Sequence, residues 1–226
     1  MKRKRPETWQ GRAVLTREAI GRAVLDTVAE VGANGLSTRR IAEHLGVSPR
    51  ALYNYVSGKD DAIAAAGYVA QSQFALPPLD DLAWQAGVRT LCDAYRAWYR
   101  QFPELVRLAS GAPMVAHPTM LDANERCFGF LRRIGIPDSE VGGTWTVLTT
   151  TLAGYAEIDA WFQRIGAAAD RPAGAAASQT LTADQYPHTL AVQRAGSDVG
   201  ADATYEGTIA MITAWISTLR DTTHST

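Results

Sequence analysis

The sequence is poor in cysteine and has no long apolar run. Its two cysteines, Cys92 and Cys127, cannot form a disulfide scaffold, so we expect two reduced thiols. No apolar run approaches the roughly 20 residues of a membrane-spanning helix, and no apolar segment follows the charged N-terminus as in a secretory signal. No Asn-x-Ser/Thr glycosylation sequence occurs either. These absences predict a soluble, cytoplasmic protein.

Strand signals and catalytic motifs are also scarce. Runs of alternating β-branched and aromatic residues are nearly absent, whereas Gly and Pro separate segments with helical spacing. We therefore expect an all-α fold of about nine or ten helices. The G-x-S-x-G, H-E-x-x-H, G-x-G-x-x-G, P-loop and zinc-binding patterns do not occur. Neither an enzyme nor a bound cofactor is expected.

A formal net charge of −1 hides an uneven distribution. Residues 1–60 carry eleven basic and six acidic side chains, a net charge of +5, so the remainder carries −6. A basic N-terminal part joined to an acidic body indicates that only the N-terminal part meets a polyanion such as nucleic acid.

Capping and turn residues divide the chain into helical segments. The run Leu76-Pro77-Pro78-Leu79 separates the first helices from the rest. Residues 166–180 have nothing to bury and are typical of a mobile loop. We expect helices over residues 16–31, 38–45, 49–55, from 59 onward, 81–100, 104–109, 119–134, 138–164, 182–195 and 202–220.

The segment 38–55 has the pattern of a helix-turn-helix. Ala42 is small where two short helices cross, and Gly46 tolerates the positive φ of a tight turn. Ser48 and Pro49 open the second helix, which can then place its first residues at base edges in a major groove. A plain helical hairpin is the alternative. The apolar residues expected between the helices are Ile41, Leu45, Val47 and Leu52.

These residues resemble a known family. The stretches GLSTRRIAEHLGVS over 35–48 and LYNYVSGK over 52–59 are similar to the DNA-binding domain of the TetR (tetracycline-repressor) family. The stretch 117–135 and the long helix after it resemble, more loosely, the C-terminal domain of the tetracycline-repressor branch. The resemblance implies a DNA-binding domain over residues 1–60 and an effector-binding and dimerisation domain over 61–226.

The resemblance implies that the helix starts meet DNA. Arg39 would contact a base or a phosphate, or be a solvated arginine, and Thr38 would donate to a phosphate or only cap its helix. Ser48 and Ala51 belong to the start of the recognition helix. Arg50 would pair with guanine or hold a phosphate.

Further contacts are expected just after the recognition helix. Tyr53 and Tyr55 match aromatic positions that touch the DNA backbone or thymine methyls, although one of them could pack inward, where Leu52 and Val56 are the better candidates. Asn54 would read adenine or face solvent. Lys59 resembles a phosphate-contacting lysine. The basic arm of residues 2–5 would follow phosphates or a minor groove, or be a solubilising tail.

Aromatic residues in the C-terminal part suggest where an effector would bind, since ligand sites are apolar with few polar groups. Tyr95 matches a pocket-lining position of the tetracycline branch. Most of the aromatic residues in this part, which also include Trp84 and Trp161, are expected to be core residues, and a few to line a cavity. The candidate ligand contacts are Tyr95, Trp98, Phe102, Phe128 and Trp145.

The isolated histidines do not indicate a metal site. His117 and His188 are each better explained as satisfied or exposed side chains. In the tetracycline repressors a histidine helps to hold a magnesium–drug complex, but Pro113 falls at that position here. We therefore expect no metal and no tetracycline effector.

The function that the resemblance implies is ligand-controlled repression. A homodimer would bind a palindromic operator and be released by a small-molecule effector. Regulation without an effector, or activation, remains open. The helices near 138–164 and 202–220 are expected to form the dimer interface because of their apolar stripes, which are Val141, Trp145, Leu148, Leu152, Tyr155 and Phe162, and Tyr205, Ile209, Ile212, Ile216 and Leu219.

Overall fold

The computed structural model describes residues 8–9, 12–13, 15–109, 116–166, 182, 184–195 and 200–223. Helices dominate these residues, as expected, and the two strands β1 (Thr8–Trp9) and β2 (Arg12–Ala13) pair antiparallel in a ribbon that the sequence did not indicate. The helices are α1 (Arg17–Gly35), α2 (Thr38–Leu45), α3 (Pro49–Leu52), α4 (Lys59–Gln71), α5 (Trp84–Gln101), α6 (Leu105–Ala109), α7 (Pro118–Arg133), α8 (Asp138–Gly166), α10 (Pro187–Ala195) and α11 (Ala201–Thr223).

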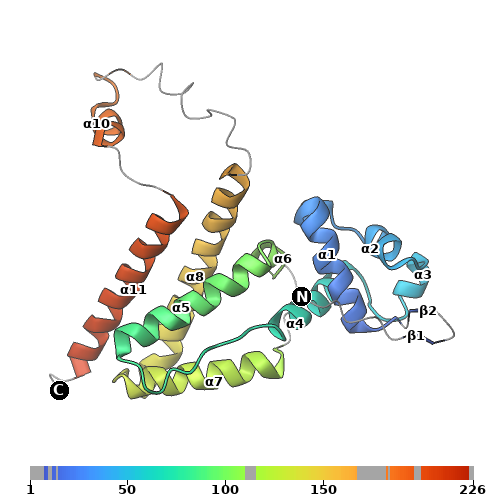
Figure 1. Cartoon of the computed structure of the whole chain (residues 1–226), viewed down its shortest axis with the longest axis horizontal. Coiled ribbons are helices and arrows are strands. Elements are labelled where there is room, and N and C mark those ends of the chain that lie inside the picture. Colours follow the sequence, from blue (N-terminus) through green and yellow to red (C-terminus); the bar gives the residue numbers. More distant parts are fainter. Residues whose placement is uncertain are drawn as a thin grey trace.

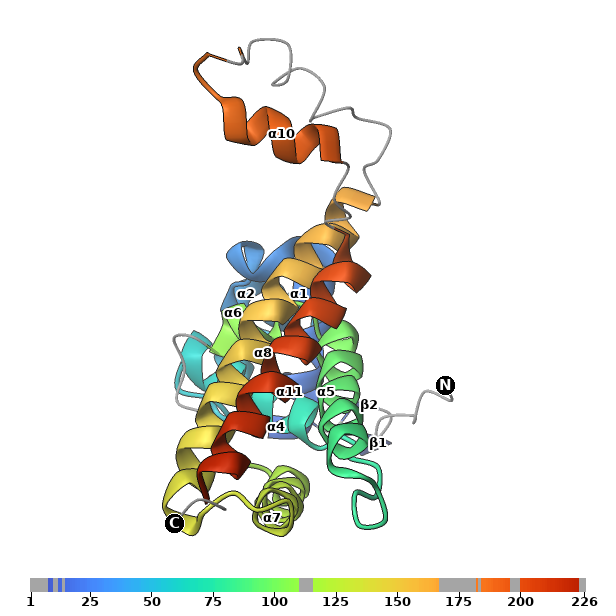
Figure 2. The ribbon, with the colours of Figure 1, turned by 90° about the vertical axis from the view of Figure 1, so that its left-hand side faces the viewer.

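The helices form two groups (Figure 1). Helices α1 to α4 gather at one end, and α5, α7, α8 and α11 at the other, with α6 between them. The long helices α5, α8 and α11 lie side by side (Figure 2), whereas α10 stands apart from them. Among the described helices none is long and apolar enough to cross a membrane.

Most helix boundaries are close to the predicted ones, and three differences have local causes. Helix α1 is kinked at Gly32, where the predicted helix ends, because this glycine has a φ of 72°. Helix α3 ends at Leu52 rather than Tyr55, and the chain then turns so that Val56 reaches the core. Helix α10 begins at Pro187 rather than at residue 182, since the residue before a proline disfavours the helical conformation.

Two hydrophobic cores share helix α4. Ala62, Ile63 and Ala66 belong to the core that α1, α2 and α3 build, and Leu108 of α6 is buried in the same core. Ala70, at the other end of α4, belongs to the core of α5, α7, α8 and α11. Helix α4 therefore connects the two groups of helices through packing as well as through the chain.

The predicted stripes on α8 and α11 turn out to face inward. Leu148 and Leu152 on α8 and Ile212 and Ile216 on α11 are buried in the subunit's own core. Both stripes are therefore buried by contacts within one subunit, because α8 and α11 use them to pack on α5 and on each other. Their use as the reason for a dimer interface was therefore wrong, and only the exposed faces of these helices are accessible to a partner.

The crossing of α1 and α4 depends on Gly21. A Cβ atom at Gly21 would lie 2.4 Å from the carbonyl oxygen of Ala65, far inside contact distance. We expect Gly21→Ala to push the helices apart and to lower the free energy of unfolding by about 2 kcal/mol in urea titrations. Gly129→Ala is the matched control, because a Cβ there meets nothing within 4 Å. Equal stability of Gly21→Ala and wild type would contradict the close crossing.

Candidate nucleic-acid interface and effector region

The helix-turn-helix is fixed by capping and by a small core. The Ser37 hydroxyl accepts from the Arg40 N–H at the start of α2, and the Ser48 hydroxyl accepts from the Ala51 N–H at the start of α3, at 3.2 Å. Gly46 ends α2 in the left-handed conformation with φ of 66°. The predicted filling residues Ile41, Ala42 and Leu52 are fully buried, with Leu45 and Val47 half-buried beside them. The local prediction is therefore confirmed.

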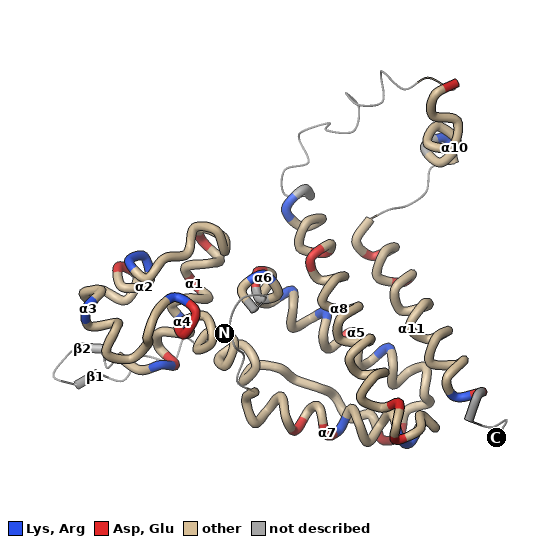
Figure 3. The backbone as a smooth tube through the Cα atoms, turned by 180° about the vertical axis from the view of Figure 1, so that it is seen from behind, with Lys and Arg blue, Asp and Glu red and all other residues tan. Residues whose placement is uncertain are grey.

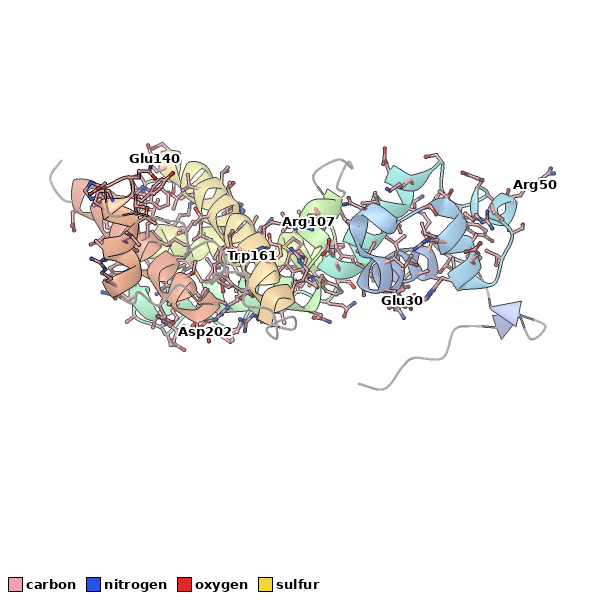
Figure 4. The ribbon with its side chains drawn as sticks, turned by 90° about the horizontal axis from the view of Figure 1, so that it is seen from above. Glu30, Arg50, Arg107, Glu140, Trp161 and Asp202 are labelled. Carbon is pink, nitrogen blue, oxygen red and sulfur yellow. The ribbon has the colours of Figure 1, made fainter. Side chains whose placement is uncertain are left out.

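None of the predicted DNA contacts is buried. Thr38 and Ala51 are half-buried, and the other predicted contacts are exposed: Arg39, Ser48, Arg50, Tyr53, Asn54, Tyr55 and Lys59. Basic residues lie on α2, on α3 and at the start of α4 (Figure 3), and Arg50 points away from the body at the far end of the molecule (Figure 4). We call this set of side chains the reading face. Residues 2–5, the predicted basic arm, lie outside the described residues.

Two side-chain contacts organise the reading face. The Thr38 hydroxyl lies 3.3 Å from the Tyr53 hydroxyl, which links the start of α2 to the residue after α3. Arg39 donates from Nε to Glu43 at 2.9 Å, one turn along α2. Thr38 does not cap α2, because Ser37 does. Leu52 and Val56, not the tyrosines, point into the core.

A clamp between Arg17 and Asp61 holds the turn after the recognition helix. Arg17, in the first turn of α1, donates to both carboxylate oxygens of Asp61 at 2.5 and 3.1 Å and to the Tyr55 carbonyl oxygen at 2.9 Å. Asp61 also accepts from the Ser57 N–H at 2.8 Å. The Arg17 hydrogen bonds, followed by that from Ser57, lower the pKa of Asp61 to about 2. These bonds fix Tyr55 and its neighbours relative to α1 and α4.

The predicted effector residues form one aromatic cluster. Ring centroids lie 6.2 Å apart for Tyr95 and Trp98, 5.9 Å for Tyr95 and Trp145, and 5.8 Å for Phe128 and Trp145. Phe102 stands 6.4 Å from Trp98. Phe74 and Tyr99 complete the cluster, although the sequence reasoning did not select them. The structure thus brings the selected aromatic residues together between α5, α7 and α8.

Polar groups around this cluster are few and mostly paired. Trp98 donates from Nε1 to the carbonyl oxygen of Ala70 in α4 at 2.8 Å. His117 caps α7 by accepting from the Thr119 N–H at 3.1 Å and packs edge-on against Tyr68 of α4 at 4.5 Å. The expectation of a satisfied histidine is confirmed for His117. His188 is exposed on α10.

The remaining candidate side chains are the cysteines and the possible metal ligands. Cys92 and Cys127 are buried free thiols, and burial raises the pKa of each to about 12. Within the described ranges no group of three or more His, Cys, Asp or Glu side chains is placed to hold a metal ion. Pro113 lies outside these ranges.

Comparisons with known proteins identify both groups of helices. Residues 22–66 match the family model described as "Bacterial regulatory proteins, tetR family", and residues 76–219 match "Tetracyclin repressor-like, C-terminal domain". The chain belongs to the TetR family. TetR-family regulators are DNA-binding transcription factors rather than enzymes, so the expectation of a non-enzymatic regulator is confirmed for this TetR-family protein.

Individual relatives agree with this assignment. The tetracycline repressor protein class C of Escherichia coli is 27% identical over 215 residues, which cover 93% of this chain and 94% of that repressor. The transcriptional repressor DrrR1 of Streptomyces coeruleorubidus is 29% identical over 128 residues, which span 56% of this chain but 47% of DrrR1. Apo ActR from Streptomyces coelicolor has the same fold, with a TM-score of 0.73 at 20% identity over 93% of this chain and 97% of ActR.

The clamp predicts a pH dependence of stability. The folded-state pKa of Asp61, about 2, lies below its ordinary value of 3.8, so the clamp stabilises the protein above about pH 4 and loses this effect as the pH falls towards 2. Because Arg17 is half exposed, we expect Asp61→Asn to cost about 1 kcal/mol near neutral pH. Urea titrations across this range should show the difference from wild type shrinking below about pH 4.

The matched control for the clamp is Asp60→Asn, which removes the neighbouring carboxylate from the same helical turn. Asp60 has no ion pair with any residue that the structure describes. Its replacement should leave stability nearly unchanged. A loss of stability as large for Asp60→Asn as for Asp61→Asn would show that helix-terminus charge, not the clamp, is responsible.

Proposed function

We propose that this TetR-family protein is a ligand-responsive transcriptional repressor that binds a palindromic operator as a homodimer. The observation that carries the proposal is the reading face, an exposed set of arginine, tyrosine and asparagine side chains on a rigidly capped helix-turn-helix. Arginine and asparagine are the side chains that pair with guanine and adenine in the major groove. A DNA-binding regulator acts where the DNA is, which supports the predicted cytoplasmic location.

Packing between the two groups of helices supports control by an effector. Leu108 of α6 is buried in the core of the DNA-binding part, while Arg107 of the same helix pairs with Glu157 of α8 at 2.8 Å. Figure 4 shows Arg107 between the two groups. A ligand that shifts α5 or α8 would therefore also move α6 and α4, and with them the reading face. Such a ligand releases DNA by favouring a conformation in which the two reading faces no longer fit adjacent grooves.

Relatives support the same proposal. An ActR structure holds actinorhodin, at 22% identity to this chain.

The division of the chain into two domains between residues 60 and 61 also stays a proposal. Helix α4, which has residues in both cores, begins just before this boundary. Regulation without an effector would be favoured if no compound stabilised the protein or released its DNA in a thermal-shift screen, and activation if a reporter gene rose with the protein.

The reading face is tested by footprinting the DNA next to the protein's own gene. We expect protection of a palindrome, and a loss of affinity of about tenfold or more for Arg39→Ala and for Tyr53→Ala. Arg132→Ala is the control, since it removes the same charge from α7, where Arg132 pairs with Asp138. Unchanged binding by Arg39→Ala and Tyr53→Ala would overturn the docking of this face on DNA.

A second face of α8 and α11 supports the homodimer. Val147, Ile158 and Trp161 on α8 and Met211 on α11 are between 46% and 56% exposed, opposite the buried stripes. Gly154 on α8 has open space around its Cβ position. Four large apolar side chains on neighbouring helices form a patch of the kind that marks protein interfaces. We propose that a second copy covers this patch and forms a four-helix interface.

The dimer is tested by placing a charge in this patch. We expect wild type to be a dimer by light scattering at micromolar concentration and Ile158→Asp to be a monomer, because a carboxylate buried at the interface would lack a partner. Leu121→Asp on α7 is the control, since Leu121 is as exposed, at 53%, but outside the patch. A monomeric wild type would refute the homodimer.

A further inference from the structure

A cavity of about 320 Å³ lies between the end of α5 and the C-terminal half of α8. It shares Tyr99 with the aromatic cluster, but its α8 residues lie on a different side of the helix from Ile158 and Trp161. Its size is at the lower end of the range for small-molecule sites. The lining residues are Tyr99, Arg100, Pro103, Ala156, Asp159, Ala160 and Gln163.

The polar side of the cavity is an ion pair with a deeply buried carboxylate. Asp159 is 3% exposed and accepts from Arg100 Nε at 2.7 Å and Nη2 at 3.0 Å and from the Tyr155 hydroxyl at 3.0 Å. Burial alone would raise the pKa of Asp159, but the hydrogen bonds from Arg100 and Tyr155 outweigh burial and keep it lowered. Asp159 is thus a permanent anion whose oxygens already have partners.

The two arginines around Asp159 still have N–H donors without a hydrogen-bond partner among the described residues. Arg96 lies 3.7 Å from Asp159 and 4.1 Å from the Tyr205 ring, and its buried Nε has no hydrogen-bond partner among the described residues. Arg96 also donates from Nη2 directly to Asp202, whose side chain is 87% exposed, and Arg100 Nη2 lies 3.8 Å from the same carboxylate. The cluster therefore holds two guanidinium groups, those of Arg96 and Arg100, against two carboxylates, those of Asp159 and Asp202. Since each guanidinium carries five N–H donors, the site has donors to spare and few free acceptors.

The other side of the cavity is apolar and aromatic. Ala156 and Ala160 are buried in its α8 wall, and Pro103 is a further apolar lining residue. The Tyr99 ring forms the wall towards the aromatic cluster, with its centroid 5.1 Å from Trp98 and 6.1 Å from Tyr95. A flat aromatic body fits against Tyr99 and these small side chains, because such rings gain from stacking or edge contacts.

We propose that this cavity binds an organic anion with an aromatic body, the carboxylate held by the Arg100 guanidinium and the ring held against Tyr99. Arg100 suits this role because about two-fifths of its side chain is exposed while its Nε and Nη2 are fixed by Asp159. A carboxylate accepts hydrogen bonds from a guanidinium in the geometry that the fixed arginine presents.

The cavity is connected to the rest of the C-terminal part through the same ion cluster. Asp159 belongs to α8, Arg96 and Arg100 to α5, and Asp202, the partner of Arg96, to the first turn of α11. An anion at Arg100 competes with these carboxylates and so acts on the packing of α5, α8 and α11. The role of this anion as an effector rests on the proposed function. Its binding to the cavity does not.

Binding is measured by isothermal titration of the full chain, without DNA, with 2-naphthoate as the probe and 2-naphthamide as its uncharged match. We expect a Kd below about 1 mM for 2-naphthoate and at least about tenfold weaker binding of the amide. Arg100→Gln should weaken 2-naphthoate at least about tenfold, since it removes the charged donor but keeps an amide to face Asp159.

Two further variants keep the test decisive. Ala160→Leu fills the cavity from α8 without changing charge, so it should also weaken 2-naphthoate at least about tenfold even if Arg100→Gln does not fold. Arg89→Gln is the matched control, because Arg89 makes the same kind of ion pair from α5 to α11, with Glu206 at 3.0 Å, outside the cavity. It should bind 2-naphthoate like wild type.

Three results would overturn the proposal. They are no binding of 2-naphthoate by wild type, equal binding of the amide and the carboxylate, and wild-type affinity of folded Ala160→Leu. None of them affects operator binding by the reading face, which the footprint tests separately. Failure of this inference and failure of the proposed function are therefore distinguishable.

Discussion

The packing of α4 in two cores is the constraint on which the rest of the structure depends. Its first half closes the core of the helix-turn-helix, and its last residues join the core of α5, α7, α8 and α11. The close crossing at Gly21 fixes α4 against α1, and the Arg17–Asp61 clamp fixes the turn that precedes α4. With both contacts in place, the orientation of the recognition helix is tied to that of α4. Because of this coupling, a displacement of α4 at its C-terminal end would also move the recognition helix.

The helix-turn-helix was predictable because its signals are local. Ser48 caps, Gly46 turns and Ile41, Ala42 and Leu52 pack within fewer than twenty residues of one another, so spacing alone indicates their roles. The clamp was not predictable in the same way. Arg17 and Asp61 are 44 residues apart, and nothing in the sequence around Arg17 indicates which distant residue it contacts. The same holds for Asp159 and Arg100, which are 59 residues apart and form the ion pair that lines the α5–α8 cavity.

Apolar stripes were predicted at the right positions but assigned to the wrong contact. Periodicity places Leu148, Leu152, Ile212 and Ile216 on single faces of α8 and α11, and those faces are indeed buried. Periodicity does not say whether the cover is the same chain or another one. Gly154 and the exposed apolar residues on the opposite face of α8 form a weaker sequence pattern than the buried stripes. Small residues and single apolar residues occur at many surface positions, so their spacing does not predict an interface. The aromatic residues predicted as ligand contacts do lie together, since large rings that share helical spacing meet in most packings, and their binding of an effector stays a prediction.

The burial of Cys92 and Cys127 has a practical consequence for following the protein in solution. Both thiols are out of reach of solvent and stay protonated far above neutral pH, and thiol reagents attack the exposed thiolate. These are the only cysteines in the sequence. A cysteine introduced at an exposed position, such as that of Asn54, is therefore the one thiol that a maleimide dye or spin label reaches in the folded protein. In the proposed homodimer, the distance between the two labelled reading faces can be measured without first removing the native cysteines.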